Sequence, residues 1–174
     1  RKATGDDRRR THDLNTAAWI PDIFMERVEA DGMWTMFNPS DAPKLTETWG
    51  PEFSGEYRSY ERVFNAGAIQ GKQMRAKHLW QQMLSTLYET GHPWITFKDT
   101  CNRANPLANE GMIRSSNLCT EITLNTGPDE TAVCNLGSIN LEAHIDERGD
   151  LQTTTQLATR MLDNIIDTMF YPTE

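Results

Sequence analysis

An amide, a thiol and a carboxylate alternate along one short segment, as Asn117, Cys119 and Glu121. In an extended chain, side chains two residues apart point to the same side, so we expect these groups to share one face. A thiol that loses a hydrogen atom becomes a thiyl radical, which can take a hydrogen atom from a C–H bond. A nearby carboxylate can remove a hydroxyl proton, and an amide can hold a hydroxyl or a developing carbonyl. Held together, the three groups could carry out radical chemistry on a hydroxylated substrate.

The spacing by itself leaves a structural interpretation open. A single Asn-x-Cys-x-Glu pattern has little specificity, and cysteine is often a buried, unreactive packing residue. A zinc site is not indicated, because there is no Cys-x-x-Cys pair and the histidines are not at ligand spacings. We therefore expect no metal ligands in this sequence.

The candidate residues lie in a stretch with strand and turn signals. Two β-rich runs, residues 118–124 and 131–136, flank the sequence Asn-Thr-Gly-Pro-Asp-Glu at 125–130. Gly-Pro-Asp is typical of a turn. We expect two neighbouring extended segments joined by that turn.

Helical patterns surround this stretch and indicate an α/β body. Apolar residues at helical spacing are clearest in residues 72–90, which Gly91 ends, and in residues 151–170, which Tyr171-Pro172 ends. The remaining expectations are helices at 6–18 and 23–31, an irregular ordered loop at 33–56, and a short strand after Pro93.

Composition limits the possible partners. The 174 residues carry a net charge of −8 and a mean hydropathy of −0.63, while five Trp and six Phe argue for a packed core. No basic patch is large enough for nucleic acid, and no apolar run approaches the roughly 18 residues that indicate a membrane span. Three cysteines suit a reducing compartment, so we expect a cytoplasmic protein. Arg1 is not a start methionine and indicates an internal boundary.

Longer strings around the candidate residues resemble one enzyme family. SSNLCTEI at 115–122 and AVCNLGSINL at 132–141 are similar to the active-site region of ribonucleotide reductase large subunits. Further similar strings are residues 1–34, HPWITFKDTCNR at 92–103 and MLDNIIDTMFYP at 161–172, so the resemblance covers essentially all 174 residues. Because large subunits of this family are several times longer, residues 1–174 are expected to be a central, incomplete segment of the catalytic barrel domain.

The resemblance implies a fold and a role for each candidate residue. The family fold is a ten-stranded α/β barrel, with a central finger loop that carries the radical cysteine at its tip, and Cys119 stands at that position. Cys119 would become a thiyl radical and take the 3′-hydrogen of a ribonucleoside diphosphate. Glu121 would remove the 3′-hydroxyl proton, and Asn117 would hydrogen-bond the substrate. Ser116 is a further expected substrate contact.

A second cysteine, Cys134, matches one of two family cysteines that reduce the radical intermediate and become a disulfide. Its family partner would lie upstream of this chain. Cys119 is not expected to be that partner, because a thiol held in a disulfide cannot carry the radical. Cys101 has no redox role in the family and is expected to be a packing residue.

Other components that the resemblance implies lie outside these residues. They are the effector-specificity loop, the phosphate-binding loop, the radical-relay tyrosines and the C-terminal shuttle cysteines, so activity would need the remaining segments of the large subunit. The strings look closer to class I, in which a metal-containing small subunit supplies the radical, than to class II, which uses adenosylcobalamin. No cofactor is expected to bind this segment itself, and thioredoxin or glutaredoxin would reduce the complete enzyme.

Two other hypotheses compete with this interpretation. One is a non-catalytic remnant that keeps the fold and only binds a partner subunit, although the presence of Asn117, Cys119 and Glu121 together argues against it. The other is a thiol–disulfide regulator that uses Cys119 and Cys134, which requires the two sulfurs to be bonded in the oxidised chain.

Overall fold

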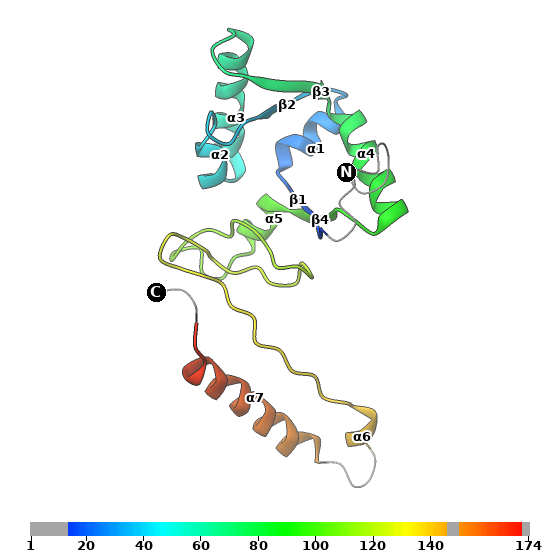
Figure 1. Cartoon of the computed structure of the whole chain (residues 1–174), viewed down its shortest axis with the longest axis vertical. Helices are drawn as coiled ribbons and strands as arrows, with labels where there is room; N and C mark the ends of the chain where they lie inside the picture. Colours follow the sequence, from blue (N-terminus) through cyan, green and yellow to red (C-terminus); the bar gives the residue numbers. More distant parts are fainter. Residues whose placement is uncertain (1–13, 146–149, 172–174) are drawn as a thin grey trace. The chain divides into compact units, whose positions relative to one another are not determined.

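The computed structural model describes residues 14–145 and 150–171 (Figure 1). The chain divides into two compact units, residues 1–130 and 131–174, and each is described by itself. Most of the helix expected at 6–18 lies outside the described residues. Its last two residues, Ala17 and Ala18, belong instead to strand β1 (Ala17–Ile20), so this end of the prediction is wrong.

Within residues 14–130, four strands form two small sheets. β1 pairs in parallel with β4 (Trp94–Phe97), and β2 (Met33–Phe37) pairs antiparallel with β3 (Gly71–Arg75). The helices are α1 (Asp22–Glu29), α2 (Lys44–Glu47), α3 (Gly50–Asn65), α4 (Ala76–Thr90) and α5 (Lys98–Arg103). The unit is therefore a mixed α/β body, as expected, and its described residues do not form a closed barrel.

Local sequence patterns predicted several of these elements correctly. The helices expected at 23–31 and 72–90 are confirmed as α1 and α4, and the strand after Pro93 is confirmed as β4. α4 begins later than predicted because residues 71–75 pair with β2. Gly91 follows α4 with φ of 73°, a left-handed conformation that glycine adopts easily at a helix end.

The region 33–56, expected to be irregular, contains β2, α2 and the start of α3. Two of its three prolines lie where helices begin, since Pro43 precedes α2 and Pro51 is in the first turn of α3. Proline is compatible with a first turn, because the N–H groups there have no partner within the helix. The prediction of a long loop was therefore wrong.

Aromatic packing fixes β2 against α1 and α3. The ring of Trp34 stacks on Tyr57 with a centroid distance of 4.2 Å and meets Phe24 edge-on at 5.0 Å. The buried Tyr57 hydroxyl accepts a hydrogen bond from the Thr35 N–H at 2.7 Å and donates one to the Thr35 carbonyl at 3.1 Å. Both main-chain groups of Thr35 are thus satisfied inside the core, which fixes the position of β2.

The buried Asp99 carboxylate joins α5 to the starts of two helices. Its two oxygens accept hydrogen bonds from the N–H groups of Asp22 and Gly50, each at 2.7 Å. Asp22 and Gly50 are the first residues of α1 and α3, where unpaired N–H groups and the helix dipole favour a negative charge. Asp99 therefore sets the positions of α1 and α3 relative to α5.

The described residues of the second unit form an extended stretch, the short helix α6 (Glu142–Ile145) and the long helix α7 (Leu151–Thr168). α7 confirms the helix expected at 151–170, and the Asp150 side chain caps it by accepting from the Thr153 N–H at 2.9 Å. The extended stretch contacts α7 through Asn135, whose amide donates to the Leu162 carbonyl at 2.7 Å. This bond holds the stretch that contains Cys134 against the helix.

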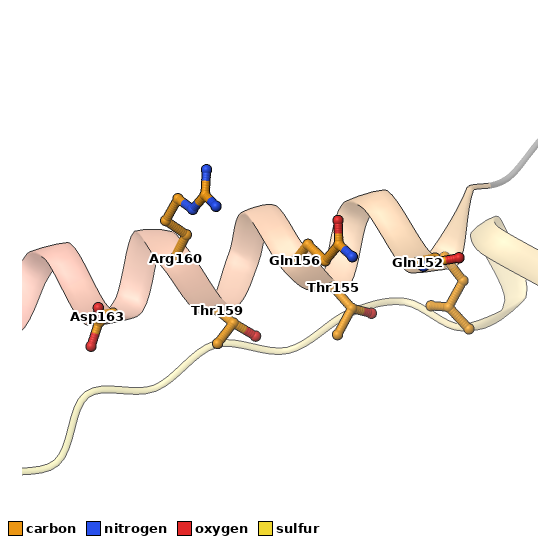
Figure 2. A pocket seen from close by; sticks show the side chains of 7 residues that line it. Gln152, Thr155, Gln156, Thr159, Arg160 and Asp163 are labelled. Atoms are coloured by element: carbon orange, nitrogen blue, oxygen red, sulfur yellow. The ribbon is translucent and has the colours of Figure 1, made fainter.

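α7 presents two different faces. Figure 2 shows the polar one, where Thr155 and Thr159 point toward the extended stretch and Arg160 points away from it. The apolar side chains Leu157 and Met161 are 62% and 56% exposed, so this unit alone does not cover them. Within residues 14–145 and 150–171, no helix is both long enough and apolar enough to cross a lipid bilayer.

Candidate functional site

The candidate residues Ser116, Asn117, Cys119 and Glu121 lie in a loop whose first limb is anchored by Asn102. The Asn102 side chain is 2% exposed; it donates to the Ile113 carbonyl and accepts from the Ile113 N–H, each at 2.9 Å. This amide therefore pairs with Ile113 much as a neighbouring strand would. It fixes the point at which the loop leaves the packed body.

The returning limb is anchored by Asn125, which is 7% exposed. Its side-chain oxygen accepts from the Asn105 amide at 2.8 Å, and its own amide donates to the Leu107 carbonyl at 2.9 Å. Asn105, Asn125 and Asn102 were not singled out from the sequence. The available signal was the number of asparagines in an irregular segment, because this side chain readily replaces main-chain pairing.

Arg114 ties the two limbs together at the base of the loop. Its guanidinium donates to the Thr126 carbonyl and pairs with the Glu47 carboxylate of α2 at 2.5 Å, while the Thr126 N–H donates to the Met112 carbonyl at 3.4 Å. The hydrogen bond and charge of Arg114 lower the pKa of Glu47. The loop between residues 114 and 126 therefore leaves and re-enters the body at one place, with Cys119 near its middle.

The tip of the loop is closed by hydrogen bonds from side chains to the main chain. The Ser116 hydroxyl donates to the Ile122 carbonyl at 2.6 Å, and the Asn117 side-chain oxygen accepts from the Ile122 N–H at 3.0 Å. Between them the chain turns, as the Thr120 N–H donates to the Asn117 carbonyl at 3.1 Å. Residues 116–122 thus form a small closed loop around Cys119.

The strand geometry expected for this segment is wrong. Residues 118–124 form no strand, and Thr120 has φ of 66°, so the alternation of an extended chain is broken between Cys119 and Glu121. The turn replaces it because Asn117 pairs with Ile122 within the loop instead of with another strand. The thiol and the carboxylate are both exposed at this tip, beside the half-buried Ser116 and Asn117.

The expected turn after the loop is present. Gly127 and Glu130 form an antiparallel bridge, with N–H to carbonyl distances of 3.0 and 3.3 Å. The flanking run 131–136 is not a strand, and Cys134 lies exposed within it, in the second unit.

Cys101 differs from the other two cysteines. It lies half-buried in α5, and burial raises the pKa of its thiol, which favours the unreactive protonated form. These features support a packing role. In the part of the chain that the structure describes, no three His, Cys, Asp or Glu side chains converge on a possible metal position.

Lys98 stabilises the base of the loop indirectly, through its hydrogen bond to α2. Its side chain is buried, with Nζ donating to the Leu45 carbonyl of α2 at 3.0 Å and lying 4.3 Å from the centre of the Phe53 ring. Burial lowers the pKa of Lys98 to about 8, although the charges of Asp99 and Glu47 act in the opposite direction. Lys98 thus holds α2, which carries the carboxylate that Arg114 binds.

The lowered pKa of Lys98 predicts a pH-dependent stability. Below pH 8 the amine is charged in both the folded and the unfolded chain, and its burial costs up to about 3 kcal/mol. From about pH 8 to pH 10.5 the unfolded chain binds more protons than the folded one, so this cost disappears as pH rises. We expect the melting temperature of the wild type, relative to Lys98→Met, to rise between pH 7 and pH 9.5.

The control for this prediction is Lys77→Met, which changes an exposed lysine on α4 in the same way. Its melting temperature relative to the wild type should not vary with pH. Thermal unfolding followed by circular dichroism at both pH values measures the two differences. Parallel behaviour of the two variants would show that burial does not affect the charge of Lys98.

Comparisons with known proteins agree over the whole chain. Residues 1–174 match the family model described as "Ribonucleotide reductase, barrel domain". The chain is 56% identical to ribonucleoside-diphosphate reductase subunit alpha of Chlamydia pneumoniae, over 99% of this chain and 17% of that protein. It is 43% identical to ribonucleoside-diphosphate reductase large chain 2 of Saccharomyces cerevisiae, over 99% of this chain. It is 36% identical to ribonucleoside-diphosphate reductase subunit alpha of Helicobacter pylori, also over 99% of this chain. It spans between 17% and 28% of the length of these three relatives.

Proposed function

The chain belongs to the ribonucleotide reductase barrel-domain family, and from this we propose that it is the segment of a ribonucleoside-diphosphate reductase large subunit that carries the radical-forming cysteine. The observation that supports the proposal most directly is the closed loop at residues 116–122. It holds an exposed thiol, Cys119, between an amide and a carboxylate, on a base anchored to the packed body. Relatives over the full chain are named as large or alpha subunits of this enzyme.

In the proposed reaction, Cys119 acts first. The radical-generating partner removes the hydrogen atom from its Sγ, and the resulting thiyl radical takes the 3′-hydrogen of the bound ribonucleoside diphosphate. Glu121 then accepts the 3′-hydroxyl proton, while the 2′-hydroxyl takes a proton from one of the two reducing thiols and leaves as water. Glu121 returns its proton to the 3′-oxygen when the intermediate is reduced. Asn117 hydrogen-bonds the substrate; because its oxygen already accepts from the Ile122 N–H, it offers its amide hydrogens as donors.

Cys134 completes the chemistry by reduction. Together with a second thiol, which the family resemblance places upstream of this chain, it supplies two electrons and two protons and becomes half of a disulfide. The hydrogen atom on Cys119 returns to carbon 3′, which regenerates the thiyl radical for return to the partner. Thioredoxin or glutaredoxin would reduce the disulfide before the next cycle. The exposure of Cys134 fits a thiol that exchanges with such partners.

The proposed assembly follows from the relatives. The segment would act with the remaining parts of a large subunit and with a metal-containing small subunit as the radical source, as in class I; adenosylcobalamin, as in class II, is the alternative source. No radical source is proposed within residues 1–174, and a cytoplasmic location stays a prediction. Control by allosteric effectors would be the property of segments outside this chain.

The test is product formation by a complete large subunit that carries residues 1–174. With the small subunit, thioredoxin and a ribonucleoside diphosphate, we expect the 2′-deoxy product, measured by chromatography. Omitting the small subunit should abolish it, since Cys119 cannot form its radical alone. Binding of the small subunit without any product would favour the non-catalytic remnant. Mass mapping of the oxidised chain would reveal a Cys119–Cys134 disulfide if the segment is instead a thiol regulator.

A further inference from the structure

We propose that Ser116 is a positioning residue for the hydrogen-abstraction step, because its hydroxyl closes the small loop that presents Cys119. This inference rests on the proposed function. The sequence predicts that Ser116 contacts the substrate. Ser116 instead binds the main chain of Ile122 and in this way positions Cys119.

The hydroxyl of Ser116 has one hydrogen and two acceptors within reach. The Ile122 carbonyl lies at 2.6 Å and the Asn117 side-chain oxygen at 3.3 Å, so the hydrogen goes to the nearer Ile122 carbonyl. Ser116 is half-buried, which shields this bond from competing water. Its hydrogen is therefore already used within the loop and is not free for donation to a substrate.

The bond from Ser116 is one half of a pair. Ile122 has its carbonyl bound by Ser116 and its N–H bound by Asn117, at 2.6 and 3.0 Å. Two consecutive side chains thus satisfy both polar groups of one residue across the loop, in the way that a strand partner would. These two bonds join Ser116 and Asn117, which precede Cys119, to Ile122, which follows it.

The turn inside this loop needs such closure. Thr120 has φ of 66°, a left-handed conformation that is unfavourable for a β-branched residue. Its N–H donates to the Asn117 carbonyl at 3.1 Å, and its hydroxyl donates to the Cys119 carbonyl at 2.7 Å. Loss of the Ser116 bond would allow Thr120 to relax toward a commoner conformation and would move the neighbouring Cys119.

Small displacements of Cys119 matter because the thiyl sulfur must approach one C–H bond. A misplacement of about 1 Å can slow an oriented reaction by roughly 100-fold. Ser116→Ala removes one of the two closing bonds and leaves Asn117 in place. We therefore expect kcat to fall about tenfold with KM unchanged, since the substrate contacts themselves remain.

The experiment compares Ser116→Ala with Ser115→Ala in the complete large subunit with its small subunit. Ser115 is the adjacent serine and the matched control: it is exposed, and its hydroxyl donates to the Ser116 carbonyl at 3.2 Å instead of closing the loop at Ile122. A third variant, Ser116→Thr, keeps a hydroxyl that can reach Ile122. The readouts are kcat, KM and the kinetic isotope effect with substrate deuterated at carbon 3′.

A positioning role predicts a particular combination of results. In Ser116→Ala the isotope effect should rise with the fall in kcat, because hydrogen abstraction becomes more rate-limiting. Ser115→Ala should match the wild type, and Ser116→Thr should recover kcat to within about threefold. A wild-type kcat in Ser116→Ala, or a change in KM alone, would overturn the proposal. If Ser116→Ala does not fold, Ser116→Thr decides, since a tenfold lower kcat there would also overturn it.

Hydrogen exchange separates this inference from the proposed function. The N–H groups of Thr120 and Ile122 are bonded across the loop, so mass spectrometry should find faster exchange of residues 117–122 in Ser116→Ala and not in Ser115→Ala. This measurement needs no turnover. A wild-type enzyme without product would refute the proposed function, whereas unchanged exchange in Ser116→Ala would refute the loop closure.

Discussion

Serine in place of Cys119 is expected to abolish deoxyribonucleotide formation by the complete large subunit. The proposed reaction requires a hydrogen atom to be removed from this side chain, and a serine O–H bond is too strong to replace the thiol in that step. We expect a loss of at least about 10⁴-fold, which corresponds to a barrier that is higher by about 5.5 kcal/mol. Chromatographic measurement of the deoxy product, with and without the small subunit, tests this expectation.

Cys101→Ser is the matched control for this substitution. It makes the same atomic change in a half-buried cysteine of α5 that the proposed reaction does not use. Cys119 is exposed on a loop, so its replacement should leave the melting temperature unchanged, whereas Cys101→Ser should lower it slightly and retain turnover. Normal turnover by Cys119→Ser would rule out Cys119 as the radical carrier.

Helices with local sequence signals were predictable, whereas α2, α3 and α5 were not predicted. α1, α4 and α7 each carry apolar residues at helical spacing or a clear end signal, such as Gly91 after α4. These signals act between residues that are close in sequence. The same reasoning predicted β4, because Pro93 ends the preceding segment and the apolar run Trp94–Phe97 follows at once.

Long-range pairing was not visible in the sequence. Ala17 and Ala18 favour a helix locally, yet they form β1 because they pair with β4, nearly eighty residues away in the chain. Residues 71–75 similarly leave the start of the predicted helix to pair with β2. In both cases a strand partner outweighs the local helical preference.

The residue types of the candidate site were predictable, but their arrangement was not. Spacing alone suggested that Asn117, Cys119 and Glu121 share one face of a strand, whereas the chain turns between them. The turn depends on side chains binding the main chain of Ile122, and no periodic pattern reports such bonds. The anchors of the loop, among them Asn102 and Arg114, were missed for the same reason.

The second large effect is expected for Glu121→Gln. Glutamine has nearly the same shape as glutamate but cannot accept the 3′-hydroxyl proton, so the step in which water leaves loses its general base. General-base catalysis typically contributes 10²–10⁴-fold, and we expect kcat for the deoxy product to fall by about that factor. The radical on Cys119 and the abstraction of the 3′-hydrogen do not require the carboxylate. Abstraction of the 3′-hydrogen should therefore continue in Glu121→Gln, which separates this variant from Cys119→Ser.

Glu130→Gln provides the comparison for this loss. Glu130 is an exposed glutamate in the turn after the loop, where it takes part through its main chain alone in the bridge to Gly127. Its replacement should leave both kcat and KM at wild-type values. A wild-type kcat in both Glu121→Gln and Glu130→Gln would show that another group takes the proton. The carboxylate on this loop would then have no catalytic role. A selective loss in Glu121→Gln would assign the base to the tip of this loop.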